Sequence, residues 1–294
     1  MLEHVDRVQL AVTDRAAAAQ TFIDVFDARI VKDDDVRALG ARRRVVHAGT
    51  SEFEFLEPSG DGPVRDYLAA WGEGLFAAGF STNDVAALAA RLSSKGVRYL
   101  EEGGQLFIAP DQTPGLRLVI SRKVARPMIG LMRYLYEATN LIDDHAAAAS
   151  FYADRFGLDA SRFVPIRSKQ YGYVGQLTMF NPPGFDPDGR LDRIELSQIT
   201  DWERPMGRFM KRRGGETLYM CYIEAAEIAP IAERLDKKGM RYAGRDPRDP
   251  HPAGIFLHPA TLHGMLMGCS RTDLAWSWSG HPELAGAQAA PAEH

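Results

Sequence analysis

One short segment occurs twice in the chain, and this repeat constrains the fold more than any other feature. RLSSKGVRY at residues 91–99 recurs as RLDKKGMRY at residues 234–242. Each copy predicts a helix that ends at a glycine and leads into a strand. Because a repeated segment of this kind is part of a repeated supersecondary unit, we expect the two halves of the chain to fold alike, with a linker at residues 124–129.

Each half contains two smaller units that share the order strand, helix and three further strands. In the first unit, residues 7–12 alternate as a strand and Asp14 is placed to cap the alanine-rich helix that follows. Similar units start near residues 74, 131 and 217. The pattern predicts an α+β chain of four βαβββ modules, paired into domains at residues 1–124 and 130–272, with a tail at residues 280–294.

Composition limits the classes of partner. The chain has 294 residues, is 45% hydrophobic and has a formal net charge of -4, so we expect neither nucleic acid nor a membrane as a partner. It has only two cysteines, Cys221 and Cys269, and no long apolar run. We therefore expect a cytoplasmic protein that binds a hydrophobic small molecule, with a homodimer as one open arrangement.

Several short strings in the expected order resemble the vicinal oxygen chelate superfamily, which includes glyoxalase I, methylmalonyl-CoA epimerase, extradiol dioxygenases and bleomycin-resistance proteins. The strings are VQLAVTD at 8–14, EFLEP at 54–58, FY at 151–152, FG at 156–157, FLHP at 256–259 and HGML at 263–266. The resemblance covers nearly the whole chain. It implies two domains with U-shaped mixed sheets, in the arrangement of extradiol dioxygenases.

The resemblance also implies a divalent metal in the sheet, held by a His and a Glu or Gln from one module and a His and a Glu from the next. The corresponding positions are Arg7, Glu54, Ala77 and Ile120 in the first domain, and Tyr134, Glu195, Tyr219 and Gly268 in the second. One carboxylate does not hold a transition metal against water. We therefore expect no metal and no other cofactor, and we expect Arg7 and Glu54 to form an ion pair.

The second domain is the predicted site of chemistry. Glu195 is the candidate general base, and the phenols of Tyr134 and Tyr219 are candidate donors to a carbonyl or enolate oxygen. Residues two apart on a strand share a face, which adds Tyr136 and Cys221 to the pocket. The further candidates for substrate binding are His258, His263 and Trp276.

These residues predict a metal-independent lyase or isomerase that acts on a hydrophobic aromatic or polycyclic carbonyl or phenolic compound. In the first alternative, the tyrosines only fill the volume of lost ligands and the chain sequesters a small molecule, as bleomycin-resistance proteins do. In the second, a different strand register, or zinc bound by His251, His258 and His263, makes it a metal-dependent dioxygenase-like or glyoxalase-like enzyme. Trp276 either covers the pocket mouth or attaches the tail to the domain edge.

Overall fold

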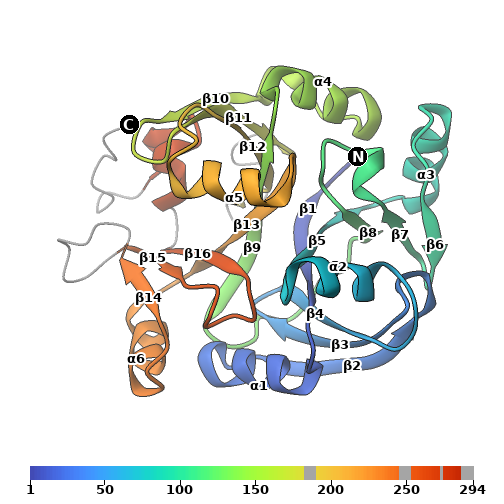
Figure 1. The fold of residues 1–294 in the computed structure, drawn as a ribbon. Helices are drawn as coiled ribbons and strands as arrows, with labels where there is room; N and C mark the ends of the chain where they lie inside the picture. The colour runs from blue at the N-terminus through green and yellow to red at the C-terminus, as the bar shows by residue number, and fades with distance from the viewer. Residues whose placement is uncertain (182–189, 245–252, 272–273, 286–294) are drawn as a thin grey trace.

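A computed structural model describes residues 1–181, 190–244, 253–271 and 274–285 of the chain. These residues form two eight-stranded mixed sheets with the same strand order, and six α-helices pack around them (Figure 1). The predicted α+β class and the pairing of βαβββ modules are confirmed. No helix within the described ranges is long and apolar enough to cross a membrane.

The first sheet has the order β2-β3-β4-β1-β5-β8-β7-β6. Its central strand β1 pairs in parallel with β4 and antiparallel with β5, so one module lies on each side of the β1–β5 contact. The bounds are β1 (His4–Ala11), β2 (Arg29–Val36), β3 (Ala41–Ala48), β4 (Ser51–Pro58), β5 (Gly74–Thr82), β6 (Leu100–Glu102), β7 (Gln105–Ile108) and β8 (Leu118–Arg122).

The second sheet repeats this order as β10-β11-β12-β9-β13-β16-β15-β14. Here β9 is the central strand, parallel to β12 and antiparallel to β13. The bounds are β9 (Met132–Ile142), β10 (Val164–Ser168), β11 (Tyr173–Met179), β12 (Arg193–Ile199), β13 (Thr217–Ala225), β14 (Tyr242–Gly244), β15 (Gly254–Leu257) and β16 (Leu266–Arg271).

Four of the helices and one face of each sheet enclose a single apolar core that extends through both halves of the chain. These helices are α1 (Arg15–Phe26), α3 (Val85–Ser94), α4 (His145–Phe156) and α6 (Ala229–Lys237). The other two, α2 (Pro63–Trp71) and α5 (Pro205–Arg213), pack against smaller apolar clusters. As predicted, Asp14 caps α1, and Asp144 caps α4 in the same way. The opposite face of each sheet, which we call its cup, carries a further apolar cluster and buried charged side chains.

The repeated segment has a structural role that its sequence did not reveal. Helix α3 contacts α4 of the other half, and α6 contacts α1, so the helices pair across the domains (Figure 1). Lys95 at the end of α3 forms an ion pair with Asp154 of α4, and Lys238 at the end of α6 does so with Asp24 of α1 at 2.7 Å. Each copy of the repeat therefore contacts the other half of the chain, through equivalent helices and an equivalent ion pair.

Candidate functional site

The central strands carry an ion pair at the same place in both cups, but with its charges reversed. In the first domain, Arg7 of β1 lies opposite Glu52 of β4. In the second domain, Glu137 of β9 lies opposite Arg193 of β12. A bulge just before each central-strand residue turns its side chain into the cup. The same register places Glu54 of β4 and Glu195 of β12 at equivalent positions, one in each cup.

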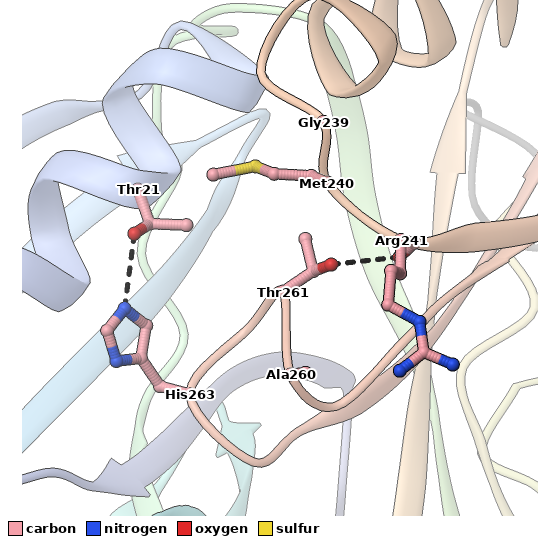
Figure 2. A pocket seen from close by; sticks show the side chains of 7 residues that line it. All are labelled: Thr21, Gly239, Met240, Arg241, Ala260, Thr261 and His263. Atoms are coloured by element: carbon pink, nitrogen blue, oxygen red, sulfur yellow. Dashed lines mark hydrogen bonds between the residues drawn. The ribbon is translucent and has the colours of Figure 1, made fainter.

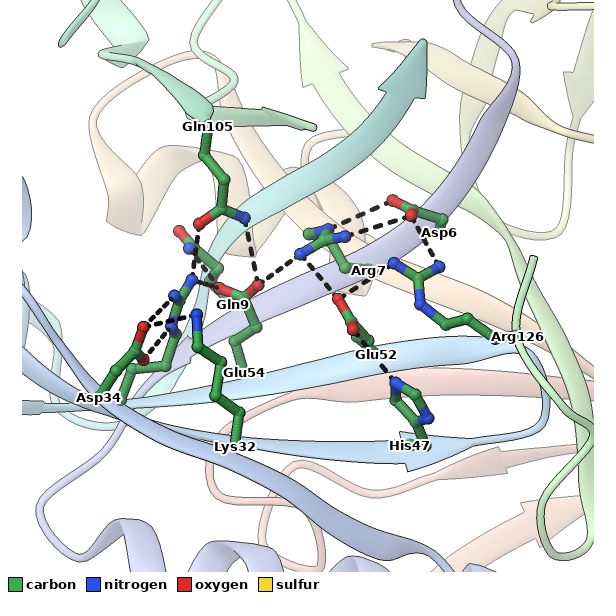
Figure 3. Close-up of polar contacts among 11 residues, drawn as sticks. Asp6, Arg7, Gln9, Lys32, Asp34, His47, Glu52, Glu54, Gln105 and Arg126 are labelled. Atoms are coloured by element: carbon green, nitrogen blue, oxygen red, sulfur yellow. Dashed lines mark hydrogen bonds and ion pairs between the residues drawn. The ribbon is translucent and has the colours of Figure 1, made fainter. Parts of the chain in front are cut away.

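In the first cup, Glu54 is surrounded by positive charge. Its carboxylate accepts hydrogen bonds from Arg7 Nη1 at 2.7 Å, Gln9 Nε2 at 2.7 Å and Arg43 Nη1 at 3.0 Å (Figure 3). Burial opposes ionisation, but the charges of Arg7 and Arg43 outweigh it and lower the pKa of Glu54 to about 2. The predicted ion pair between Arg7 and Glu54 is confirmed.

In the second cup, Glu195 has a like charge as its neighbour. Glu137 is held by Arg193, whose guanidinium lies 2.7 Å from the carboxylate, and neither side chain is exposed. Glu195 accepts a hydrogen bond from Ser197 Oγ at 2.7 Å and shares another with Glu137. Burial, together with the charge of Glu137, raises the pKa of Glu195 to about 8. At neutral pH the pair therefore holds one proton.

Aromatic side chains line the second cup around this carboxyl pair. Tyr136 lies with its ring 5.1 Å from the Arg193 guanidinium and its hydroxyl 3.0 Å from Ser270 Oγ. Tyr134 donates a hydrogen bond to Glu224 at 2.9 Å. Burial raises the pKa of both phenols, so each stays protonated at neutral pH. The buried members of the apolar cluster are Tyr134, Tyr136, Leu177, Met179, Leu191, Met220, Tyr222, Ala275 and Trp276.

A short segment near the C-terminus covers the second cup. Trp276, in the 3-10 helix at Leu274–Trp278, is only 5% exposed and packs in the same apolar cluster as the tyrosines. Just beyond it, Ser279 accepts a hydrogen bond from Arg193 Nη1 at 2.7 Å. Trp276 therefore packs with the aromatic side chains of this cup, and its role in covering a pocket mouth stays a prediction.

The structure brings only some of the predicted residues together. The register corrects the first-strand position, because Glu137 and not Tyr134 is the equivalent of Arg7. Tyr219 packs both against the apolar cluster of the cup and against α5, where its ring lies 5.1 Å from Phe209, and burial raises its pKa to about 12. Cys221 points away from the cup into the shared core, with its Sγ 3.6 Å from Met265 Sδ. In the first domain the register likewise places Ile120 in the shared core.

The two described histidines of the last hairpin also lie away from the cup. His258 Nδ1 accepts a hydrogen bond from the backbone N–H of Ala260, which stabilises a turn. His263 lies between the domains, 3.0 Å from Glu73 Oε2 and 3.1 Å from Thr21 Oγ1 of α1. It lines a crevice of about 310 Å³ beside Met240 (Figure 2). His251 lies outside the described residues.

The residues in the cups do not fit the metal that the fold family implies. Within the described ranges, no group of three or more His, Cys, Asp or Glu side chains could hold a metal ion. In the first cup a guanidinium, that of Arg7, occupies the space beside Glu54. In the second, the side chain of Arg193 already neutralises Glu137. A cation next to these guanidiniums would be repelled.

Sequence reasoning missed Glu137 and Arg193. The alternation of Tyr134 and Tyr136 suggested a regular strand, and a bulge at Tyr136 cannot be seen in a pattern of residue types. The available signal was the first domain itself. Had Arg7 been aligned with Glu137 from the helix caps Asp14 and Asp144, the reversed ion pair would have been visible.

Comparisons with known proteins agree with this architecture. Residues 4–109 match the model of the Glyoxalase/Bleomycin resistance protein/Dioxygenase superfamily. A triple variant of 4-hydroxymandelate synthase from Streptomyces coelicolor superimposes with a TM-score of 0.70 over 92% of this chain and 93% of that one, at 13% sequence identity. Such low identity shows a common fold and no more. The first domain thus matches this superfamily in sequence, and the whole chain shares the fold of the synthase.

Shorter members of the superfamily match only part of the chain. A variant of methylmalonyl-CoA epimerase from Streptomyces coelicolor covers 43% of this chain with all of its own, at 26% identity and a TM-score of 0.39. The epimerase from Mycobacterium tuberculosis covers 48% at 19% identity, with a TM-score of 0.39. No curated protein matches this chain.

Proposed function

We propose that the chain is an enzyme that moves protons on a small carbonyl or phenolic compound, without a metal, in the cup of its second domain. The observation that carries the proposal is the buried carboxyl pair Glu137 and Glu195 beside Arg193, in which burial and the charge of Glu137 raise the pKa of Glu195. Strongly perturbed carboxyl groups concentrate at catalytic sites. In the equivalent place of the other domain, the charges of Arg7 and Arg43 instead lower the pKa of Glu54 to about 2.

The chemistry follows from the charge of the pair. At neutral pH the protonated Glu195 can donate its proton to a substrate oxygen or carbon, and the resulting carboxylate can take a proton back from a neighbouring carbon. When Glu195 is protonated, the positive charge of Arg193 balances the negative charge of Glu137, so the three side chains together are neutral. Tyr136, which stays protonated, can donate a hydrogen bond to a developing enolate oxygen. This set of groups suits an isomerase or a lyase.

The walls of the cup indicate the class of substrate. Tyrosine, methionine and tryptophan side chains surround the pair, and they favour an aromatic or otherwise apolar body with one polar group. A substrate of this kind would occupy the space that Trp276 fills, so binding requires the segment at Leu274–Trp278 to move. Trp276 is then part of the substrate entrance.

Exchange of substrate hydrogens with solvent tests the proposal. A set of aryl ketones in D2O, followed by proton NMR, reports enzyme-catalysed exchange beside the carbonyl. We expect Glu195→Gln to reduce exchange at least about 100-fold while the fold is kept. Glu233→Gln is the matched control, because Glu233 is exposed on α6. This variant should catalyse exchange of the ketone hydrogens at the wild-type rate. Equal exchange by wild type and Glu195→Gln would contradict the proposal.

Non-catalytic sequestration is the second candidate. The second cup is closed, with Glu195 only 7% exposed and Trp276 packed over it, as in a site that holds a ligand and releases it slowly. In that case an aryl ketone would bind and raise the melting temperature, but neither wild type nor any variant would exchange its hydrogens. The same NMR experiment therefore separates the two candidates.

A further inference from the structure

The first cup, which the proposed reaction does not use, contains a cavity of about 340 Å³. The ion-pair network around Glu54 lines it (Figure 3). Within this network, Arg7 and Arg43 are each only 5% exposed. The remaining residues that line the cavity are Lys32, Val45, Glu52, Gly103, Gly104, Gln105, Ser121, Arg122, Val124 and Arg126. The volume is at the lower end of the range for ligand pockets.

This network has no free carboxylate to offer a ligand. Glu54 is bound by Arg7 and Arg43, and Glu52 pairs with Arg7 at 2.7 Å and with Arg126 at 3.2 Å. Behind them, Asp34 binds Arg43 through both oxygens at 2.7 and 2.8 Å. The network is therefore rigid and its acceptors are already used.

Two residues that line the cavity carry donors without a partner among the residues that the structure describes. Ser121 is 6% exposed, and its buried hydroxyl has no hydrogen-bond partner among the described residues. Arg122, the next residue at the end of β8, is exposed, and its guanidinium forms no ion pair or hydrogen bond within the described part of the chain. Leaving a buried hydroxyl unpaired is costly unless a ligand or water pairs with it.

The charges around the cavity leave one positive charge uncompensated. Five cations line it, and four carboxylates bind all of them except Arg122. The cations are Arg7, Lys32, Arg43, Arg122 and Arg126, and the carboxylates are Asp6, Asp34, Glu52 and Glu54. A ligand with a single negative charge would neutralise the site. The side chains of Val45 and Val124 supply apolar wall for the rest of such a ligand.

We propose that the first cup binds a small organic carboxylate with one negative charge, whose oxygens pair with Ser121 and Arg122. The apolar body of the ligand lies against Val45 and Val124. This site is separate from the carboxyl pair of the second domain, so either can fail without the other.

Calorimetric titration with sodium benzoate at fixed ionic strength tests the site, with benzamide as the uncharged analogue and inorganic phosphate as the alternative anion. We expect saturable binding of benzoate, at least about tenfold weaker binding of benzamide and phosphate, and at least about tenfold weaker benzoate binding by Arg122→Gln. Ser121→Ala should lower the affinity for benzoate by about fivefold.

Lys123→Gln is the matched control. It removes a positive charge from the next residue, which pairs with Glu3 and does not line the cavity, so benzoate should bind as to wild type. Four results would overturn the proposal. They are no benzoate binding up to about 10 mM, equal binding of benzamide, preference for phosphate, or equal loss of affinity in Lys123→Gln and Arg122→Gln.

Discussion

Glu54 and Glu195 occupy equivalent positions in the two domains, and their pKa values are shifted in opposite directions, to about 2 and about 8. Both are buried, so burial does not distinguish them. The two glutamates differ in their neighbour on the central strand, which is Arg7 in the first domain and Glu137 in the second. Reversal of one ion pair thus turns a structural carboxylate into a group that can transfer protons near neutral pH.

The dependence of stability on pH should reflect this difference. Because the pKa of Glu195 is raised in the folded state, its proton stabilises the fold at low pH, and this stabilisation is lost as the pH rises from about 4.5 to about 8. Urea unfolding across this range should show a decline of a few kcal/mol in wild type and a smaller decline in Glu195→Gln. An identical decline in both proteins would argue against a raised pKa.

Acid should act on the first domain through Glu54. Its lowered pKa means that the ionised form stabilises the fold above about pH 4.5, and that this contribution is lost as the pH falls towards 2. Glu54→Gln should therefore lower the free energy of unfolding at pH 7, by about 3 to 5 kcal/mol, because Arg7 and Arg43 lose a buried partner. At pH 2 the two proteins should differ much less. A constant difference at both pH values would contradict this account.

Trp276 should contribute to stability as well as cover the cup. Its side chain is 5% exposed, so Trp276→Ala would leave a cavity beside Tyr136 and cost about 3 to 5 kcal/mol. Trp276→Phe keeps part of the volume and should cost less. Chemical unfolding measures the free energy of unfolding of both variants. If Trp276→Ala is as stable as wild type, the segment does not pack over the cup in solution.

The two halves should unfold together. They share one apolar core, and the pairs Lys95–Asp154 and Lys238–Asp24 join helices of different halves. Scanning calorimetry should therefore give a single transition whose calorimetric and van't Hoff enthalpies agree. Two separate transitions would show that each domain is stable on its own.

The fold could be predicted from the sequence because a repeat and its helix caps are local signals. The segment at 91–99 and its copy at 234–242 each end a helix at a glycine, and Asp14 and Asp144 mark the starts of α1 and α4. Helix α2 lacks such a signal, since its N-cap Gly62 makes no side-chain hydrogen bond, and it was not predicted.

The site was predicted only in part, because its geometry depends on strand register. Glu195 was identified from its place on the last strand of a module. Its partners Glu137 and Arg193 come from another part of the chain and meet it only after a bulge at Tyr136. Alternation places side chains on a face only while the strand is regular, which is why Cys221 was assigned to the cup and lies in the core.

The titration of Glu195 tests the central claim most directly. With glutamate labelled by carbon-13 at Cδ, NMR from pH 4 to 9 should show one carboxyl that titrates near pH 8 in wild type and is absent in Glu195→Gln. Glu137→Gln should move this titration down by at least about one pH unit, because the like charge is removed. If every glutamate of the wild-type protein titrates below about pH 6, the pair holds no proton at neutral pH and the proposed chemistry is wrong.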